Sequence, residues 1–361
     1  MDLINDFRDK NSILAISKLI KQECKKPINI MEICGGHTHS IIKFGIDQIV
    51  GENINFVHGP GCPVCILPKI VIDTSIKLAS IKNTIFCTLA DMMRVPGSFT
   101  SLQKLRGEGK DIRALYTPLD ALKIAINNPE KNVIFFAIGF ETTTPMTALL
   151  IEKCLKNNVK NLFFYINHVN VPAPVKAIMS DKTAKIEAFL GPSHVSVIIG
   201  SDAFKPLANE FKTPIAVSGF EPLDIMMSIL NLVRQKNQNS YEVFNEYDRV
   251  VKPQGNLKAL ALMDKYFKIC DFSWRGLGNI KNSGFDLKDE FDFLNAKKIF
   301  DCKVESKGES KACICGEILR GHAKPKDCKV FGKICNPQSP IGSCMVSSEG
   351  ACAAYYKYRQ I

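Results

Sequence analysis

The chain has 361 residues, a formal net charge of +11 and 46% hydrophobic residues, values expected of a soluble globular protein with two or three domains. Residues 1–6 include acids where a signal peptide carries basic and apolar residues, and no apolar run reaches the roughly 18 residues of a membrane span. These features argue against a secreted or membrane protein and predict a cytosolic one.

The 14 cysteines do not indicate a disulfide framework, which is typical of much smaller secreted domains. In a reducing compartment, metal binding or thiol redox chemistry is the expected use of at least some of them. Nucleic acid is one explanation of the positive charge, but no stripe of interleaved aromatic and basic side chains supports it. A solvated lysine-rich surface explains the charge better and stays compatible with an acidic protein partner.

The first predicted element is a helix over residues 11–24, where apolar side chains recur on one face. Apolar strands and helical stretches then alternate along the chain. The clearest further helices are predicted over 143–157 and 223–235. Strands are predicted over 28–33, 54–57, 84–89, 112–116, 133–138, 162–166, 195–199 and 215–217.

Short apolar strands separated by helices favour parallel sheets that are covered on both faces. Eight such strands predict two sheets, and therefore an α/β fold of two lobes with a cleft between them. The similar segments 139–142 (GFET) and 219–222 (GFEP) both follow a strand, as expected of two related lobes. The expected domains are 1–118, 119–246 and a small Cys-rich domain over 247–361 that a metal centre stabilises.

The first candidate site is the segment 34–39 (CGGHTH), which directly follows a predicted strand. Its thiol and imidazoles are therefore expected at the carboxyl end of the strand, where open α/β sheets build their sites. The two glycines between Cys34 and His37 allow a tight turn and a close approach to a bound group. The structural alternative is a strand-to-helix turn with a buried free cysteine.

The second candidate site is the segment 58–65 (HGPGCPVC), again directly after a strand. The C-x-x-C spacing of Cys62 and Cys65 suits either a disulfide or a shared metal ion, and such motifs often stabilise a reactive thiolate. Half of a structural zinc site is the alternative, but no second pair stands at finger-like spacing. If the two strands are neighbours, Cys34 converges with this pair.

Further polar candidates lie at the ends of later strands: Asp91 and Glu141 follow strands, and His168 and His194 flank strands of the second lobe. Each has a structural alternative. Asp91 is suited to cap a helix, and Glu141 is suited to the first turn of a helix. Both histidines could be loop residues whose hydrogen bonds are satisfied. A position at the same edge of a sheet is what favours a functional role.

The C-terminal segment gathers cysteines that lack a histidine pair, and their wide gaps are unlike those of zinc fingers. This spacing favours an iron–sulfur cluster over zinc, with unpaired buried thiols as a third alternative. The expected ligands are Cys313, Cys328, Cys335 and Cys352, with Cys315 and Cys344 nearby.

Four segments together resemble the hydrogenase maturation factor HypD family, in the order that family shows: 34–39 (CGGHTH), 59–65 (GPGCPVC), 139–143 (GFETT) and 345–352 (MVSSEGAC). The resemblance covers essentially the whole chain. It implies a protein that, with a small HypC-type partner, carries an Fe(II) ion while cyanide and carbon monoxide are attached. A HypE-type protein would donate the cyanide, and the loaded iron would pass to a [NiFe]-hydrogenase large subunit, without nucleic acid or membrane.

The resemblance also implies roles for single residues. Cys34 matches the thiol that holds the iron jointly with the small partner, and His37 matches an important neighbour of it. The remaining matches are a redox-active pair at Cys62 and Cys65, polar cleft residues at Asp91, Glu141 and His194, and [4Fe–4S] ligands at Cys313, Cys328, Cys335 and Cys352. Cys315 is an alternative first ligand.

Two functional hypotheses follow. The leading one is a metallocentre assembly scaffold, which need not turn over a free substrate. The alternative is a thiol–disulfide oxidoreductase in which a cluster reduces the Cys62/Cys65 pair and Cys34 holds no iron. Cys34 with His37 favours the scaffold, because a simple dithiol reductase does not need them.

Overall fold

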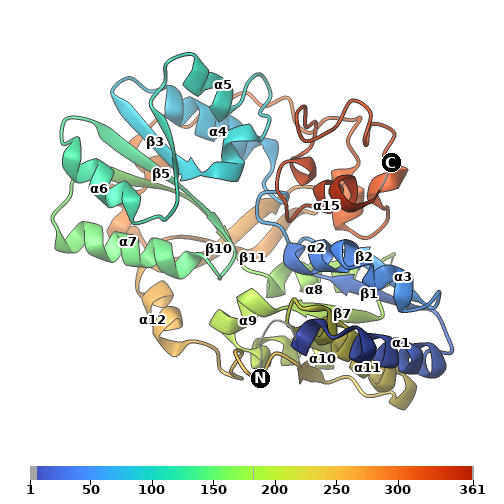
Figure 1. Ribbon diagram of the computed structural model, residues 1–361. Helices are drawn as coiled ribbons and strands as arrows, with labels where there is room; N and C mark the ends of the chain where they lie inside the picture. Colours follow the sequence, from blue (N-terminus) through green and yellow to red (C-terminus); the bar gives the residue numbers. More distant parts are fainter. Residues whose placement is uncertain (1–5, 182, 360–361) are drawn as a thin grey trace.

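Two sheets with helices on both faces make up the computed structural model, which describes residues 6–181 and 183–359 (Figure 1). Sheet A is parallel throughout and has the strand order β2-β1-β7-β8-β9. Its strands are short, and β1, β7 and β8 are almost wholly buried, as expected when helices cover both faces. They are β1 (Ile28–Glu32), β2 (Ile54–His58), β7 (Ala188–Pro192), β8 (Ile215–Ser218) and β9 (Val243–Asn245).

Sheet B has the order β10-β11-β6-β5-β3-β4. Strands β3 to β6 are parallel, while β10 and β11 form an antiparallel hairpin added at the β6 edge. The strands are β3 (Thr84–Leu89), β4 (Ile112–Leu115), β5 (Asn132–Gly139), β6 (Leu162–Val169), β10 (Phe267–Trp274) and β11 (Gly278–Leu287).

The helices connect these strands and end near the C-terminus with α15. No helix in the described part of the chain is long and apolar enough to cross a membrane. The α-helices are α1 (Lys10–Glu23), α2 (Gly35–Lys43), α3 (Ile46–Ile49), α4 (Lys69–Ser80), α5 (Leu102–Gly107), α6 (Asp120–Asn127), α7 (Thr144–Lys156), α8 (Pro172–Ser180), α9 (Ser193–Ile199), α10 (Lys205–Phe211), α11 (Pro222–Gln238), α12 (Leu257–Tyr266), α13 (Ala296–Ile299), α14 (Cys315–Leu319) and α15 (Ala351–Tyr358). Short 3-10 helices are η1 (Asp6–Arg8), η2 (Ala90–Arg94), η3 (Ser201–Phe204), η4 (Asp289–Leu294), η5 (Pro325–Asp327) and η6 (Ser343–Met345).

The α/β class and the two sheets are confirmed, and so are the three predicted helices, which are α1, α7 and α11. One predicted strand is wrong: residues 195–199 belong to helix α9, and the strand of this region is β7, just before it. A short apolar run fits a strand and a buried helix equally well. Here Pro192 ends β7, and Gly200, at φ 86°, ends the helix.

The two sheets do not follow the expected division of the chain. The boundary near residue 118 falls inside sheet B, because β3 and β4 before it join β5 and β6 after it. Sheet A combines β1 and β2 with the later strands β7 to β9. The segment beyond residue 246 is not purely Cys-rich either, since it supplies the hairpin β10–β11 to sheet B.

Apolar side chains on both faces of the sheets form the core. Strand β5 is buried at seven of its eight residues, and the aromatic rings of Phe136 and Tyr165 stack with centroids 5.0 Å apart. Burying a side chain such as Phe136 contributes about 1.5–3 kcal/mol of transfer free energy. These cores fix the carboxyl ends of β1, β2, β7 and β8, where the site lies.

Candidate functional site

Cys34 lies at the carboxyl edge of sheet A, in extended conformation at the N-cap of helix α2. Because β1 and β2 are neighbouring parallel strands, the loops that follow them meet: the Gly35 N–H donates to the Gly61 carbonyl at 3.0 Å. A Cβ atom on Gly61 would lie 2.4 Å from the Cys34 nitrogen, so this approach requires glycine. The predicted convergence of Cys34 with the Cys62/Cys65 loop is confirmed.

Burial is the main influence on the Cys34 thiol and raises its pKa to about 12. The nearby Glu349 carboxylate raises this pKa further, and Glu32 adds to it, whereas the backbone N–H groups of Gly36 and His37 lower it. The residue as a whole, backbone included, is of intermediate exposure. Since a metal ion binds the thiolate, metal binding at Cys34 would release a proton.

Cys62 and Cys65 form a disulfide in the loop between β2 and α4, with their Cα atoms 5.3 Å apart. Both residues are buried. The Ser343 hydroxyl donates to the Cys65 carbonyl at 3.2 Å, so the disulfide loop touches the Cys-rich C-terminal segment directly. The sequence left a disulfide or a shared metal ion open for this pair, and the structure has the disulfide.

His37 is fully buried between helix α2 and the end of β8. Its Nε2 lies 3.0 Å from the carbonyl oxygens of both Ser218 and Gly219, so Nε2 carries the proton and donates to them. Nδ1 then carries a lone pair, and no described residue donates a hydrogen bond to it. Burial lowers the pKa of His37 to about 4, which keeps the ring neutral.

His194 reaches the same edge from the start of α9, which takes the place of the strand over 195–199 that His194 was expected to flank. The Phe220 ring packs against both imidazoles, with centroid distances of 4.8 Å to His37 and 4.4 Å to His194. Burial of its ring lowers the pKa of His194, and His194 in turn lowers the pKa of His37. Gly36 is required here as well, because a Cβ atom would lie 2.5 Å from the Phe220 ring.

A buried polar network lies under the turn and was missed by the sequence analysis. Glu32 Oε1 contacts His58 Nδ1 and accepts a hydrogen bond from the Thr38 hydroxyl at 3.1 Å. His58 Nε2 lies 3.1 Å from the Tyr355 hydroxyl of helix α15. The signal was available, since Glu32 is a carboxylate within an apolar strand and His58 stands beside it in the register.

Asp91 reaches the site from sheet B, in η2 directly after β3. Its charge raises the pKa of Glu349, for which burial is the larger cause, and Glu349 acts on Cys34 as described above. The Glu349 carbonyl oxygen would lie 2.3 Å from a Cβ atom on Gly35. Sheet A and the C-terminal segment therefore meet beside Cys34, and Asp91 of η2 acts on Glu349 of that segment.

Glu141 and His168 lie elsewhere, and no hydrogen bond or ion pair of the described chain joins either to the Cys34 turn. Glu141 follows β5, is 2% exposed and accepts a hydrogen bond from the Val171 N–H at 3.1 Å. His168 forms a hydrogen bond inside the core, where its Nε2 lies 2.8 Å from the Thr147 hydroxyl. Burial lowers the pKa of His168 to about 4.

Cysteines of the C-terminal segment converge on one small, enclosed cavity. Burial raises the pKa of Cys352 well above its usual value, and four neighbouring thiols raise it further. No group of three or more His, Cys, Asp or Glu side chains among residues 6–181 and 183–359 is arranged to hold a metal ion. The donors are nevertheless all thiols, which suits an iron–sulfur cluster. The cavity is lined by Cys313, Cys315, Cys328, Cys335, Cys344 and Cys352.

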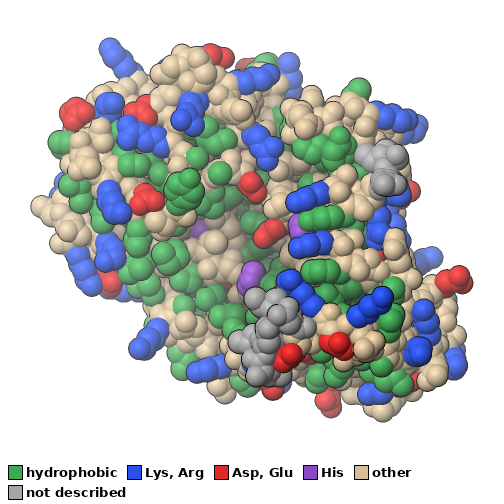
Figure 2. All heavy atoms as spheres, viewed as in Figure 1, with side chains coloured by type: hydrophobic (Ala, Val, Ile, Leu, Met, Phe, Trp, Pro, Cys, Tyr) green, Lys and Arg blue, Asp and Glu red, His purple; other side chains and the backbone are tan. Residues whose placement is uncertain are grey.

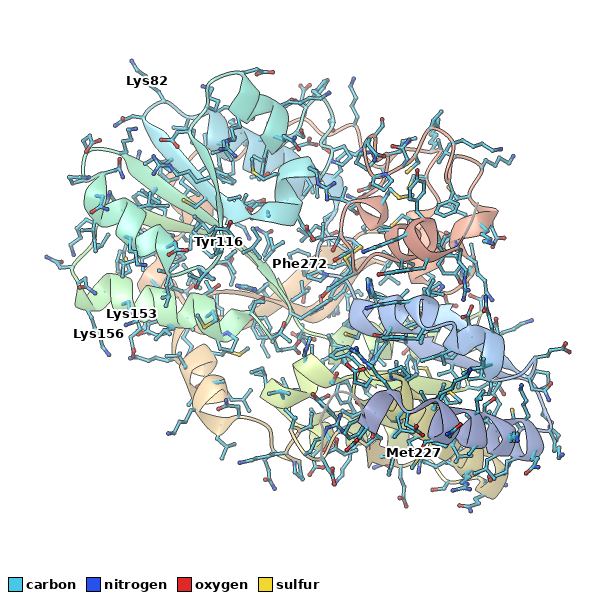
Figure 3. The ribbon with its side chains drawn as sticks, in the orientation of Figure 1. Lys82, Tyr116, Lys153, Lys156, Met227 and Phe272 are labelled. Atoms are coloured by element: carbon cyan, nitrogen blue, oxygen red, sulfur yellow. A yellow bond between two sulfur atoms is a disulfide. The ribbon has the colours of Figure 1, made fainter. Side chains whose placement is uncertain are left out.

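Lysine and arginine side chains are spread over the molecular surface shown in Figure 2, and a hollow between the two halves exposes apolar and histidine side chains. Lys82, Lys153 and Lys156 extend outward from the sheet B half (Figure 3). This distribution agrees with a solvated lysine-rich surface.

Comparison with known proteins gives a consistent result. A family model named HypD and described as "Hydrogenase formation hypA family" matches residues 10–359. The hydrogenase maturation factor HypD of Azotobacter vinelandii is 46% identical, over 99% of this chain and 97% of its own. The factors of the same name from Escherichia coli K12 and Cupriavidus necator are 44% and 43% identical, over 100% and 99% of this chain and 95% and 97% of their own. The chain therefore belongs to the HypD family of hydrogenase maturation factors.

Proposed function

We propose that this protein is the scaffold on which, with a small HypC-type partner, iron receives cyanide and carbon monoxide to form the Fe(CN)2CO group of a [NiFe]-hydrogenase. The observation that carries the proposal is the placement of Cys34. Cys34 is a residue of intermediate exposure, next to the Cys62–Cys65 disulfide loop and to Glu349.

Cys34 would hold the iron as a thiolate, a soft donor that suits Fe(II) bearing diatomic ligands. The groups that shift the pKa of this thiol, Glu349, Glu32 and the backbone at the start of α2, include no other cysteine. A thiolate from the small partner would complete the donor set. His37, on the helix that Cys34 caps, has a neutral ring whose Nδ1 has no partner among the described residues.

The Cys62–Cys65 disulfide would supply redox support. Its reduction takes two electrons and two protons and yields two thiols beside Cys34. An iron–sulfur cluster held by Cys313, Cys328, Cys335 and Cys352 would supply single electrons when bound. The contact between Ser343 and the Cys65 carbonyl supports this role, because Cys344 of the cysteine cavity is the next residue.

The hollow between the two halves offers space in which the remaining proposed partners could approach the site. A HypE-type cyanide donor and a hydrogenase large subunit must each reach the same iron. Cys34 stands at a junction of three chain regions, so closure of a partner over it would exclude water during ligand attachment.

Infrared spectroscopy of the anaerobically purified complex with the small partner tests the scaffold. Cyanide and carbonyl stretching bands are expected in the wild-type complex and are expected to disappear in Cys34→Ala. Absence of any such band in the wild type, with all iron accounted for by the cluster, would refute the proposal.

The disulfide favours one other candidate, an iron–sulfur-dependent thiol–disulfide oxidoreductase. In that case Cys34→Ala would leave reduction of the Cys62–Cys65 disulfide intact and no iron beyond the cluster would be found. The scaffold requires iron at Cys34 in addition. Counting iron per chain in the wild type and in Cys34→Ala separates the two functions.

Removal of the proposed cluster ligands gives a second test. Cys328→Ala or Cys335→Ala should abolish the visible absorption of a cluster and weaken folding of the C-terminal segment, because ligation and folding are coupled in small metal domains. Cys270→Ala, a cysteine on β10 outside the cavity, is the control and should keep the colour. Colour retained in both ligand variants would refute this ligand set.

A further inference from the structure

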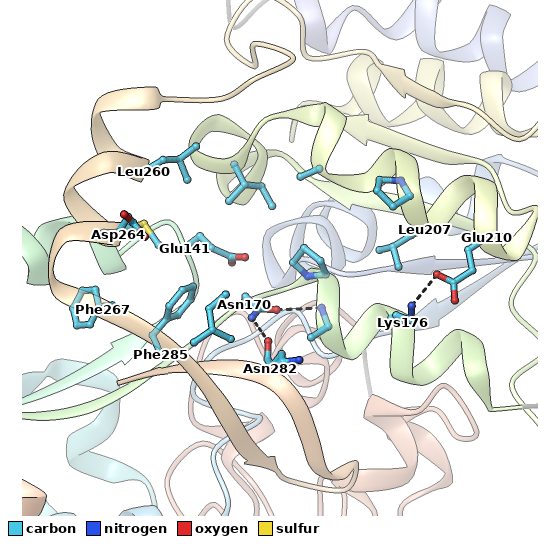
Figure 4. A pocket seen from close by; sticks show the side chains of 17 residues that line it. Glu141, Asn170, Lys176, Leu207, Glu210, Leu260, Asp264, Phe267, Asn282 and Phe285 are labelled. Atoms are coloured by element: carbon cyan, nitrogen blue, oxygen red, sulfur yellow. Dashed lines mark hydrogen bonds and ion pairs between the residues drawn. The ribbon is translucent and has the colours of Figure 1, made fainter. Parts of the chain in front are cut away.

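A second cavity, of about 510 Å³, lies where sheet B meets the helices of sheet A, outside the Cys34 site. Helices α8, α10 and α12 and strands β10 and β11 surround it (Figure 4). This volume and a mainly apolar lining are typical of small-molecule sites, which often lie at the junction of domains. The lining includes Ala173, Leu207, Leu260, Met263, Phe267 and Phe285.

The carboxyl group of Glu141 is the buried polar group of this cavity. Glu141 is 2% exposed, and its side chain extends toward the middle of the cavity in Figure 4. The Val171 N–H donates to its two oxygens at 3.1 and 3.3 Å, and no Lys, Arg or His of the described chain forms an ion pair with it. Buried carboxylates are usually paired with a cation, so this one lacks its usual partner.

The charges around the rim have the same sign. Glu210 and Asp264 also line the cavity, and the single lysine there, Lys176, is bound to Glu210 at 2.9 Å. Three carboxylates against one lysine leave a net negative lining in a chain whose formal net charge is +11. The cavity therefore favours a positively charged ligand over an anion.

We propose that this cavity binds an organic cation, an ammonium group on an apolar alkyl or aryl body, with the ammonium paired to Glu141. The apolar body would replace water against Leu207, Phe267 and Phe285. Two sources present this chemistry, a free small amine and a lysine side chain of a bound protein. The inference does not depend on iron at Cys34.

Calorimetric titration with n-hexylammonium and with 1-hexanol tests the proposal on the full chain. At pH 8 the Glu141 carboxyl, whose pKa burial raises to about 7, is ionised. The cation is expected to bind at least about tenfold more tightly than the alcohol, which corresponds to one charge-assisted hydrogen bond. Equal affinity, or no heat with either probe, would overturn the proposal.

Glu141→Gln supplies the matched variant, since glutamine keeps the shape and the acceptor but removes the charge. It should bind n-hexylammonium at least about tenfold more weakly and leave 1-hexanol unchanged. Glu108→Gln, at an exposed position after α5, is the control and should bind like the wild type. Unchanged cation affinity in Glu141→Gln would contradict the assignment.

Competition distinguishes the two sources. If purified HypC-type partner displaces n-hexylammonium, the natural cation is a side chain of that protein. If the partner and the probe bind together, the ligand is a free amine. If 1-hexanol displaces n-hexylammonium and the partner does not, the cavity is apolar and does not select for charge. That result would overturn the proposal.

Discussion

Burial sets the protonation state of the ionisable side chains that follow the strands. It holds the Cys34 thiol protonated, keeps the His37 ring neutral and raises the pKa of Glu141 to about 7. Cys34 and Glu141 therefore become charged when a cation arrives or a proton leaves, whereas the His37 ring already has a free lone pair. A site of this kind stays unreactive until its ligand binds.

Glu141→Gln should remove a pH dependence of stability. The pKa of Glu141 is raised from 4.5 in the unfolded chain to about 7 in the folded one, so the folded state holds this proton more tightly. Its stabilising effect is complete below pH 4.5 and is lost as the pH rises through 7, on the order of a few kcal/mol. Urea unfolding from pH 4.5 to 8 measures it.

The wild type should lose stability across this window more steeply than Glu141→Gln, while Glu108→Gln should follow the wild type. Parallel curves for the wild type and Glu141→Gln would show that the carboxyl group titrates normally.

The sequence predicted the Cys34 turn but not the residues that support it. Motif spacing identifies Cys34, Cys62 and Cys65 because thiols at strand ends are rare and chemically distinctive. Glu32 is recognisable as a carboxylate within an apolar strand, but the sequence does not show that it pairs with His58. Their pairing depends on the register of β1 against β2, and their link to Tyr355 depends on tertiary packing.

Helix α15 is the element that ties the cysteine cavity to the Cys34 turn. Cys352 in its first turn lines the cavity. One turn later the Tyr355 hydroxyl contacts His58, and the Tyr358 hydroxyl lies 3.1 Å from His39 of α2. The same short helix thus touches both candidate metal sites.

Tyr355→Phe should destabilise the protein by about 0.5–1.5 kcal/mol, because it removes the hydroxyl that contacts the buried His58 ring. Denaturant unfolding gives the value. The neighbouring Tyr356→Phe is the matched control, since its ring packs against Phe331 instead, and it should change stability less. The opposite order of the two variants would contradict the network.

Element prediction succeeded where periodicity or length was decisive and failed where it was not. The apolar face of α1 and the long helices α7 and α11 were recognisable. Residues 195–199 were not, because five apolar or small residues satisfy either a strand or a buried helix. The hairpin β10–β11 was missed because many of its residues are exposed, so it lacks the continuous apolar run by which the other strands were recognised.

At the scale of the whole molecule, Arg275 joins parts that are distant in the chain. It follows β10, is 5% exposed, and its Nε donates to the Leu67 carbonyl at 2.9 Å. Its Nη1 pairs with Glu309 at 2.9 Å, and its backbone N–H donates to Ile66 at 2.7 Å. The disulfide loop, sheet B and the C-terminal segment are therefore held by one side chain.

Arg275→Met should lower the free energy of unfolding by roughly 2 kcal/mol or more, because it removes a buried charged donor from two partners. Arg234→Met is the control: Arg234 pairs with Glu23 at the surface, and its loss should change stability by less than about 1 kcal/mol. Chemical denaturation of both variants measures the difference. Equal effects would contradict the linking role of Arg275.

Two sheets were predictable from the number and the apolar character of the strands, but their membership was not. Strand order depends on which helices return the chain to which sheet. The chain enters sheet A with β1 and β2, leaves for β3 to β6, returns for β7 to β9 and ends with β10 and β11 in sheet B. A linear division at residue 118 cannot represent this path.

This path also bears on synthesis at the ribosome, where N-terminal segments emerge first. Cys34 is made early, yet β7, which pairs with β1, and Tyr355, which contacts His58, are made much later. A nascent or truncated chain therefore lacks the last contacts of the Cys34 turn. The Cys34 turn therefore gains all of its contacts only when the chain is finished.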